Sequence, residues 1–421
     1  MNTKIYNRNI TKSLLPVIIV VLMFSVELTA YIQRWIDKSL ASILLYQIVI
    51  VCMLFFAAKR KREINTNNLI WSVLYFYLLL LFIRLLIDFV IPDKGFFLYK
   101  TANTILFFYV CPILIPSIFF KQYRFDFDVK SVAFIIGAVL LLCVVSSLND
   151  ILSGHAIQDN DGRYRTAIFS IGFGQYSTTL FIIGCYLVSV LTGFKLSRMI
   201  ALIFTVVGIT GVIFSGSRGP FITTITCFVV FILSQVKNTR RLIIVVIVIM
   251  LIIPLAGDVL IDINNYMRSN GIYAFDRVIR SLFEENGLTN HSSGRDNLYK
   301  EAWELFMSNP LLGNSYLIPG KIYAHNIIVE QFMATGLFGG LAFLIVNIWG
   351  LIKGFKLMKR DLTFAIIPLL YLQYFIYGCL SVTILALFPY WLFLLLTINK
   401  SDTVSIYERS KTFGKYNNTN V

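Results

Sequence analysis

Apolar residues occur along this chain in long uninterrupted runs that are separated by short polar segments. A helix crosses a bilayer with roughly 20 consecutive apolar residues, and many of the runs approach or reach that length. The pattern predicts twelve membrane-spanning helices, at about 13–33, 40–58, 69–91, 98–120, 131–149, 168–193, 199–215, 219–236, 242–258, 324–350, 363–379 and 383–399. The last two runs are short and poorly separated, so eleven spans is the alternative.

The composition agrees with an all-α integral membrane protein, because hydrophobic residues make up 57% of the chain and charged residues 14%. We expect one polytopic membrane domain over residues 1–400, followed by a polar tail at 401–421 that lies in the cytoplasm. The first apolar run is too long, and too closely followed by a second, to be a cleaved signal peptide.

Lys and Arg residues gather in alternate loops. If the amino terminus is cytoplasmic, most of the 37 Lys and Arg residues lie inside, among them the KRKR run at 59–62. The bias predicts that both termini are cytoplasmic. The net charge of +15 then reflects topology and affinity for anionic lipids. The charge is poor evidence for a nucleic-acid partner, and we expect none, since no soluble domain carries a basic face interleaved with aromatic residues.

Two polar segments are predicted on the outer side, at 150–167 and at 259–323. The three histidines, His155, His291 and His325, fall in these segments or at their edge. All six cysteines fall inside predicted spans, where they are best interpreted as small core residues. The sequence therefore predicts neither a disulfide framework nor a zinc site.

The long outer segment contains a helix signal that begins with Ser293-Gly294-Arg295-Asp296, a capping-box pattern. The helix should run through Met307, because Asn309 and Pro310 end it. Arg295 then lies in the first helical turn, where the free backbone N–H groups favour an anion and an Arg strengthens the site. The alternative is a solvated Arg on a loop helix.

A second Arg lies in the short joint Ser-Gly-Ser-Arg-Gly-Pro at 215–220, between two predicted spans. Ser217 is a candidate N-cap for the following helix, and Pro220 suits its first turn. Arg218 is costly in lipid unless it is paired, although it could also extend to the headgroups. Arg163 and Arg165, just before the sixth span, are further candidates for binding an anion, with interfacial anchoring as the alternative.

The residues around His325 resemble a known family. His325-Asn326, nine residues, Gly336, two residues and Gly339 are similar to the H-N-x9-G-x-x-G signature of the O-antigen ligase and O-antigen polymerase superfamily. The joint at 215–219 and the pattern from Arg295 through Trp303 to 309–313 also resemble that family. The resemblance covers roughly 160–350, whereas the first five spans are similar only in hydropathy.

The resemblance implies a glycosyltransferase C-like membrane fold. It also implies transfer of glycan from an undecaprenyl diphosphate carrier on the outer side of the cytoplasmic membrane, without metal or another cofactor. Such a transfer needs cations on the leaving diphosphate, and Arg218 and Arg295 offer planar, bidentate contacts. His325, with an ordinary pKa of about 6.5, is the candidate base for the attacking sugar hydroxyl, with substrate positioning as the alternative. The expected substrate-binding residues are Arg165, Arg163 and Asn326.

Three further features allow more than one interpretation. Asp159-Asn-Asp161 could bind a cation, although the preferred mechanism uses no metal. Gly336 and Gly339 are expected inside a helix, where they allow close packing against a neighbouring helix or the lipid carrier. Arg84 and Asp88 lie four residues apart in the third span, and we favour a structural pair that braces the outer cavity over a functional one.

The leading hypothesis is a polymerase that joins lipid-linked repeat units of a surface polysaccharide in a bacterial cytoplasmic membrane. A ligase that transfers finished glycan to lipid A core is the nearest alternative, since the motifs do not separate the two. A twelve-span transporter or flippase is disfavoured because the notable charges gather on the outer side. The expected partners are undecaprenyl-diphosphate-linked oligosaccharide as donor and acceptor, membrane lipids, a chain-length regulator and a flippase.

Overall fold

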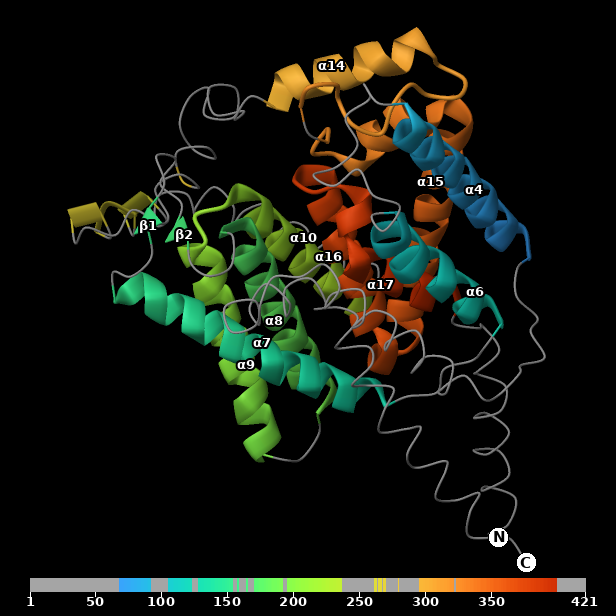
Figure 1. Ribbon diagram of the computed structural model, residues 1–421. Coiled ribbons are helices and arrows are strands. Elements are labelled where there is room, and N and C mark those ends of the chain that lie inside the picture. The colour runs from blue at the N-terminus through green and yellow to red at the C-terminus, as the bar shows by residue number, and fades with distance from the viewer. Residues whose placement is uncertain are drawn as a thin grey trace, which may run out of the picture.

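The computed structural model describes residues 68–91, 105–122, 128–153, 157–158, 164–165, 170–191, 195–236, 295–321 and 323–399, with a few positions between 261 and 279. This part of the chain is helical apart from turns and one small pair of strands (Figure 1). Seven of its helices are long and apolar enough to cross a membrane. The prediction of an α-helical membrane protein is confirmed to that extent.

The elements succeed one another along the chain as follows: α4 (Asn68–Val90), η2 (Leu106–Leu114), α6 (Ile115–Gln122), α7 (Val129–Leu152), β1 (Ile157–Gln158), β2 (Tyr164–Arg165), α8 (Ser170–Val190), α9 (Lys195–Phe214), α10 (Arg218–Gln235), α14 (Arg295–Ser308), α15 (Ile327–Arg360), η3 (Leu362–Phe364), α16 (Ile366–Leu380), η4 (Ile384–Ala386) and α17 (Phe388–Asn399).

Seven predicted spans correspond to α4, α7, α8, α9, α10, α15 and α16. The fourth prediction corresponds to η2 and α6, where Pro112 lies inside a π-helical stretch, and the twelfth to α17, which has only 12 residues. The first, second and ninth predictions lie outside the described residues, so a total of twelve spans stays a prediction.

Two predicted boundaries are wrong. α15 continues to Arg360 instead of ending at 350, because its final turns carry Lys and Arg residues that leave the apolar layer and suit the carboxyl end of a helix. α17 begins at Phe388 instead of 383, because residues 384–386 form a 3-10 turn. The gap between the last two membrane helices is therefore longer than the hydropathy indicated.

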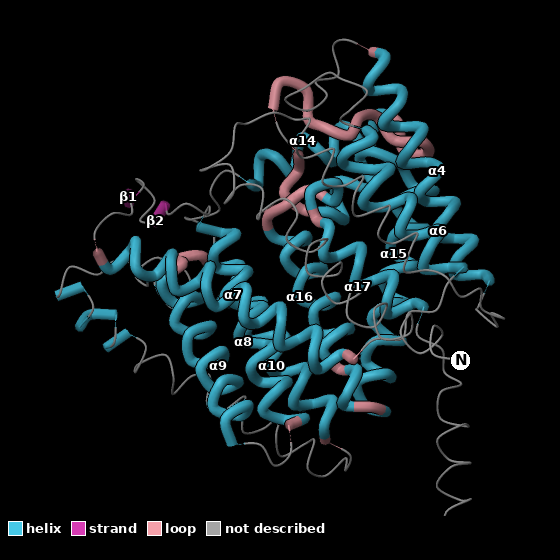
Figure 2. Tube along the Cα trace, turned by 60° about the horizontal axis from the view of Figure 1, so that its bottom comes forward, coloured by secondary structure: helices cyan, strands magenta, loops and turns pink. Residues whose placement is uncertain are grey.

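The helices form two groups that meet at α16. One group contains α7, α8, α9 and α10, and the other contains α4, α6, α15 and α17; α16 contacts α8 and α10 on one side and α15 and α17 on the other (Figures 1 and 2). Within the first group, α8 and α9 pack closely because their glycines leave room. A Cβ at Gly208 would collide with the backbone of Phe181, and one at Gly211 with the side chain of Ser177.

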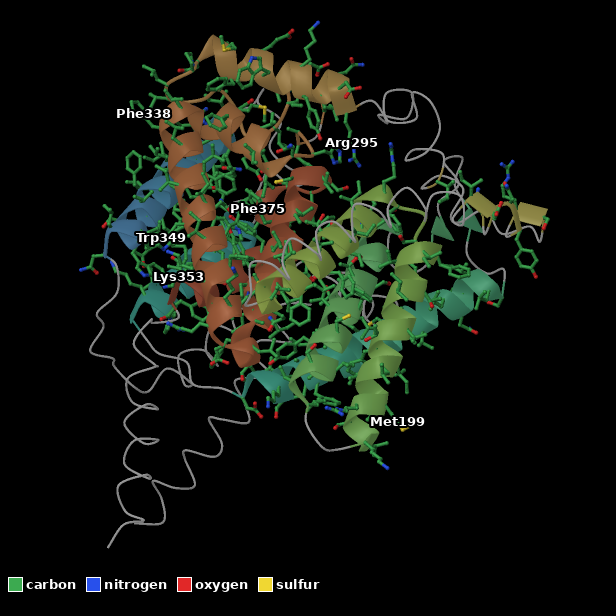
Figure 3. The ribbon with its side chains drawn as sticks, turned by 180° about the vertical axis from the view of Figure 1, so that it is seen from behind. Met199, Arg295, Phe338, Trp349, Lys353 and Phe375 are labelled. Atoms are coloured by element: carbon green, nitrogen blue, oxygen red, sulfur yellow. The ribbon has the colours of Figure 1, made fainter. Side chains whose placement is uncertain are left out.

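The outer surface of the helices is apolar, as a lipid-facing surface requires. Leu142 is 73% exposed and Val206 60% exposed. Phe338 and Trp349 point outward from α15 (Figure 3). The buried positions, by contrast, include many aromatic residues, such as Tyr77 and Phe343 with ring centroids 5.3 Å apart.

α14 lies across one end of the helices, on α15 (Figure 1). The described part of the 150–167 segment contains a two-residue antiparallel pair, in which Ile157 pairs with Arg165 and Gln158 with Tyr164. This pairing is a small addition to the all-α prediction. In the predicted orientation, the end that carries α14 is the outer end.

Candidate functional site

The candidate site is organised around the connection between α16 and η4. We call residues 380–384, from Leu380 to Ile384, the 380–384 segment. Its backbone is irregular, since Ser381 has φ −158° and ψ −16° after the last residue of α16. Irregular backbone in a membrane protein needs hydrogen-bond partners from the rest of the protein. Two of the three predicted catalytic residues supply such partners.

Arg295 is the first residue of α14 and is half-buried. Its Nη1 donates to the carbonyl oxygen of Leu380, and its Nη2 lies 3.5 Å from the Ser381 hydroxyl oxygen. The carbonyl at the end of α16 has no partner within its own helix, and the negative end of the helix dipole favours a cation. The guanidinium faces the membrane helices from the underside of α14 (Figure 3).

A guanidinium carries five N–H donors in a fixed plane. The contacts with Leu380 and Ser381 use one side of that plane. Within the described residues, these are the hydrogen bonds that Arg295 makes, so donors are left for an anion. Arg295 is therefore not a solvated loop residue, the alternative considered from the sequence. It is fixed against α16 and still has N–H donors available.

His325 precedes α15 and is held in an unusual conformation. Its φ is 58°, in the left-handed region that non-glycine residues rarely occupy. Its Nδ1 lies 2.9 Å from the carbonyl oxygen of Ser381, and its ring packs against Tyr323 with centroids 4.4 Å apart. A carbonyl can only accept, so Nδ1 carries the proton in the neutral ring and Nε2 is the acceptor.

The electrostatic surroundings keep His325 neutral. Burial lowers its pKa, the nearby Arg295 cation lowers it further, and the hydrogen bond to Ser381 acts in the opposite direction. A neutral imidazole whose Nε2 accepts is the form that can remove a proton from a hydroxyl. The arrangement is therefore suited to general-base chemistry at neutral pH.

Arg218 begins another helix that passes beside the 380–384 segment. It is the first residue of α10, after a turn in which Gly216 has φ 61°. Its neighbour Gly219 lies beside Leu380, since a Cβ on Gly219 would be 3.9 Å from the Leu380 side chain. Arg295 and His325 thus meet at Leu380 and Ser381, and the backbone that carries Arg218 passes beside Leu380.

The N-cap predictions have different outcomes. Ser217 takes the N-cap position of α10, but its hydroxyl donates to the Ser215 carbonyl and does not cap the helix. Asn326 caps α15, where its Oδ1 accepts from the N–H groups of Ile328 at 2.9 Å and Val329 at 3.3 Å. Asn326 was expected to bind substrate, but its side-chain oxygen is used in capping the helix. Ser293 lies outside the described residues.

Two other predicted site residues, Arg163 and Arg165, belong to the 150–167 segment. Arg165 lies in β2, where its backbone is described but its side chain is not, and Arg163 falls outside the described residues. His155, His291 and the Asp159-Asn-Asp161 pair also fall outside the described residues. In the ranges that are described, no group of three His, Cys, Asp or Glu residues could hold a metal ion.

Gly336 is not a helical glycine, which corrects the interpretation from the sequence. Its φ of 64° and ψ of −161° break α15 at this point. The turn at 309–314 fits into the break: Leu337 N donates to Pro310 O at 2.8 Å and Asn314 N donates to Met333 O at 2.9 Å. A Cβ at Gly336 would collide with the Leu311 carbonyl group. Gly336 therefore serves to seat this turn, not the lipid carrier.

Replacing Gly336 should destabilise the protein more than replacing a glycine with a similar φ in open space. Gly320 has φ 70°, and a Cβ there would meet nothing within 4 Å, so Gly320→Ala measures the cost of the conformation alone, about 1–2 kcal/mol. Gly336→Ala adds the collision with Leu311, which makes a clearly larger fall in melting temperature the expected result. Thermal unfolding of both purified variants checks this, and equal falls would contradict the account of the break.

Arg84 and Asp88 brace the same turn from α4. Arg84 Nη1 donates to Asp88 at 3.2 Å and to the carbonyl of Asn314 at 2.5 Å, and Nη2 donates to the carbonyl of Gly313 at 3.0 Å. Asp88 accepts from the N–H of Tyr316 at 2.6 Å. The pair thus contacts protein backbone, in agreement with the structural interpretation favoured from the sequence.

The sequence interpretation missed the acceptor side of the site. Residues 380–382 were taken as a short gap between two poorly separated spans, with 383 and 384 inside the second, and Glu330, a fully buried carboxyl in α15, was not singled out. Its signal was available, because an acidic residue inside a predicted span is rarely accidental. Tyr316 and Thr383, which contact Glu330 or each other, carried no such signal.

Residues 203–344 match the protein family described as O-Antigen ligase. No curated protein sequence matches the chain. The matched region runs from α9 into α15 and contains Arg218, Arg295 and His325, together with both glycines of the signature. The match confirms the resemblance found in the motifs. Over residues 203–344, the chain is therefore similar to the O-antigen ligase and O-antigen polymerase superfamily.

Proposed function

We propose that this protein is a polymerase that joins undecaprenyl-diphosphate-linked oligosaccharide repeat units of a surface polysaccharide, on the outer side of the bacterial cytoplasmic membrane. Members of the superfamily are glycosyltransferase-like enzymes. The observation that carries the proposal is that Arg295 and His325 bind adjacent carbonyl groups, of Leu380 and Ser381, at the end of the helices that α14 covers.

The geometry supports a direct displacement. His325 Nε2 accepts the proton of the attacking sugar hydroxyl while that oxygen forms a bond to the anomeric carbon of the donor. The bond between the anomeric carbon and the diphosphate oxygen breaks, and its electron pair leaves with the diphosphate. Arg295, with Arg218, stabilises the negative charge that develops there. Each cycle lengthens one glycan by a repeat unit and releases undecaprenyl diphosphate, with no metal in any step.

The rest of the chain completes the proposed enzyme. Residues 1–400 form the membrane domain, with a family-like core at about 160–350 and the outer loop at 259–323, and 401–421 form a cytoplasmic tail. Arg163 and Arg165 extend the cationic surface toward the diphosphate. Membrane lipids surround the helices, and a chain-length regulator and a flippase are the expected protein partners.

A ligase is the second candidate, because the matched family is described as O-Antigen ligase. The bond formed is of the same kind, and only the acceptor differs. Deletion of the gene followed by electrophoresis of the surface glycan distinguishes the two. Loss of long chains with single-repeat products remaining on the surface supports a polymerase. Long chains that accumulate on the lipid carrier would contradict it and indicate a ligase.

The orientation can be tested by cysteine labelling in a background without the native cysteines. Ser269→Cys and Ser292→Cys should react with a membrane-impermeant thiol reagent added to intact cells, because both lie in the predicted outer loop. Ser197→Cys and Ser401→Cys should react only after permeabilisation. If Ser292→Cys also needs permeabilisation, the proposed site faces the cytoplasm and the reaction on the outer side is refuted.

The pH dependence should follow His325. Because burial lowers its pKa, kcat/KM should be level near neutral pH and fall only below the ordinary value of about 6.5, as the imidazole takes up a proton. The corresponding fall in kcat should occur at a higher pH than the fall in kcat/KM, since the bound diphosphate favours the imidazolium and so raises the pKa of His325 in the complex. Both profiles can be measured with purified protein. Persistence of the same acidic limb in the residual activity of His325→Ala would assign it to another group.

A further inference from the structure

Glu330 is a buried carboxyl that the proposed reaction does not use. It lies in the first turn of α15, five residues after His325, and its side chain is not exposed at all. Its Oε1 accepts from the Tyr316 hydroxyl at 2.9 Å, from the N–H of Ile384 at 3.1 Å and from Gln331 Nε2 at 3.1 Å. Its Oε2 has no hydrogen-bond partner among the described residues.

These contacts hold the far end of the 380–384 segment. Ile384 is bound to Glu330 directly, and Thr383 is bound through the Tyr316 hydroxyl, which also contacts Glu330. The Ile384 carbonyl accepts from Trp391 Nε1 at 3.1 Å. The near end of the same segment carries the Leu380 and Ser381 carbonyls that accept from Arg295 and His325. Only Val382 separates the two ends.

We propose that Glu330 is a positioning residue: by holding Ile384 and Thr383, it sets the place of the Ser381 carbonyl, which selects the Nδ1–H form of His325 and leaves Nε2 to act as the base. The effect on rate rests on the proposed function, but the effect on the imidazole does not. Glu330 does not touch substrate in this account, because it lies fully buried behind the segment that it holds.

A role in stability alone explains the arrangement poorly. Burying a carboxyl in a membrane helix is costly, and apolar side chains of similar size often stabilise a protein equally well or better. Asn347 offers a comparison in the same helix. Its Oδ1 accepts from Tyr371 at 2.9 Å and from Tyr390 at 2.8 Å, so it too joins parts of the chain that are far apart in the sequence. It lies 17 residues further along α15, beyond the break at Gly336, and its hydrogen bonds go to its own helix, α16 and α17 instead of the 380–384 segment.

The test reads the tautomer of His325 directly. The chain has three histidines, so His155→Gln with His291→Gln leaves one imidazole, which nitrogen NMR of isotopically labelled histidine can observe in the full-length protein. With Glu330 present, the signal should be that of a single Nδ1–H form. Glu330→Ala should give a mixture of both tautomers. Glu330→Gln keeps an acceptor oxygen for Ile384 and Tyr316 and should restore the single form.

Activity gives the second readout. A displacement of about 1 Å at a reacting group can cost on the order of 10²-fold in rate, so Glu330→Ala should lower kcat by about 10- to 100-fold, and Glu330→Gln should stay near wild type. Asn347→Ala should lower the melting temperature without changing the histidine spectrum. If Glu330→Ala does not fold, Tyr316→Phe is the alternative variant. It removes the link to Thr383 and should convert part of the His325 signal to the other tautomer.

The outcomes separate the two proposals. An unchanged histidine signal in folded Glu330→Ala or in Tyr316→Phe, or an equal change in Asn347→Ala, overturns the positioning role and leaves the polymerase proposal intact. Wild-type protein that joins no repeat units overturns the proposed function, while the NMR measurement still decides whether Glu330 sets the tautomer of His325.

Discussion

His325→Ala should slow glycan polymerisation by about 10²–10⁴-fold while the protein still inserts and folds. The structure gives the reason, because the Nδ1 of His325 is fixed on the Ser381 carbonyl and its Nε2 is the acceptor that a sugar hydroxyl would meet. The strained φ of 58° also indicates that the backbone is held for this side chain. The measurement is the rate of polymer formation by purified protein, normalised to the amount of folded protein.

His155→Ala and His291→Ala are the matched controls for this variant. Neither residue belongs to the signature that contains His325. Both variants should keep close to the wild-type rate. A near-normal rate for His325→Ala would remove the imidazole from the chemistry and leave binding of the diphosphate by arginines as the whole mechanism.

Arg295→Lys should lower activity by about 10²–10³-fold at a normal protein level, the usual cost of losing one donor to a developing negative charge. An ammonium can replace the bond to the Leu380 carbonyl, but it has no planar fork that reaches Ser381 and a phosphate together. Arg218→Lys should behave similarly, since its backbone lies beside the same segment. Activity with a lipid-linked donor is the measurement.

Lys300→Ala is a suitable control for the arginine variants, because Lys300 is an exposed cation on the same helix as Arg295. It removes a charge from α14 without touching the candidate site, so its activity should remain near wild type. If both Arg→Lys variants make polymer at the wild-type rate, the two arginines are surface residues and the diphosphate is held elsewhere.

The sequence predicted the seven membrane-length helices of the described residues because hydropathy is a local property. A run of apolar residues is sufficient to predict α4, α7 or α8, whatever the rest of the chain does. Boundaries failed where another local effect followed, as at the basic end of α15 and at the 3-10 turn before α17. The exact end of a helix depends on a few residues, and mean hydropathy over about 19 positions does not resolve them.

The motifs in the outer loop were found from the sequence, but their physical meaning was not. Two motifs, the 309–313 turn and Gly336, proved to be two halves of one contact, in which the turn enters a break in α15. Spacing along a chain gives no sign that Leu311 and Gly336 touch. Gly336 was therefore assigned to helix packing, although its φ of 64° shows that it leaves the helix.

The candidate site itself was predicted only on the donor side. Arg218, Arg295 and His325 stand out because charged and imidazole groups are rare beside apolar helices. Arg295 and His325 bind backbone carbonyl groups, of Leu380 and of Ser381, and a carbonyl group leaves no signature in the sequence. Glu330 could have been noticed as an acid in a span, but its link to Ile384 is a long-range contact that only the fold reveals.

The central claim is that this protein lengthens lipid-linked glycans, and the most direct test is to supply purified protein in vesicles with a single lipid-linked repeat unit. A chelator should be present, so that dependence on a metal would appear as loss of activity. The account predicts a ladder of products that differ by one repeat unit, with one undecaprenyl diphosphate released per bond formed. The contradicting result is that the single repeat unit remains unextended while the same protein transfers preformed glycan to a lipid A core acceptor.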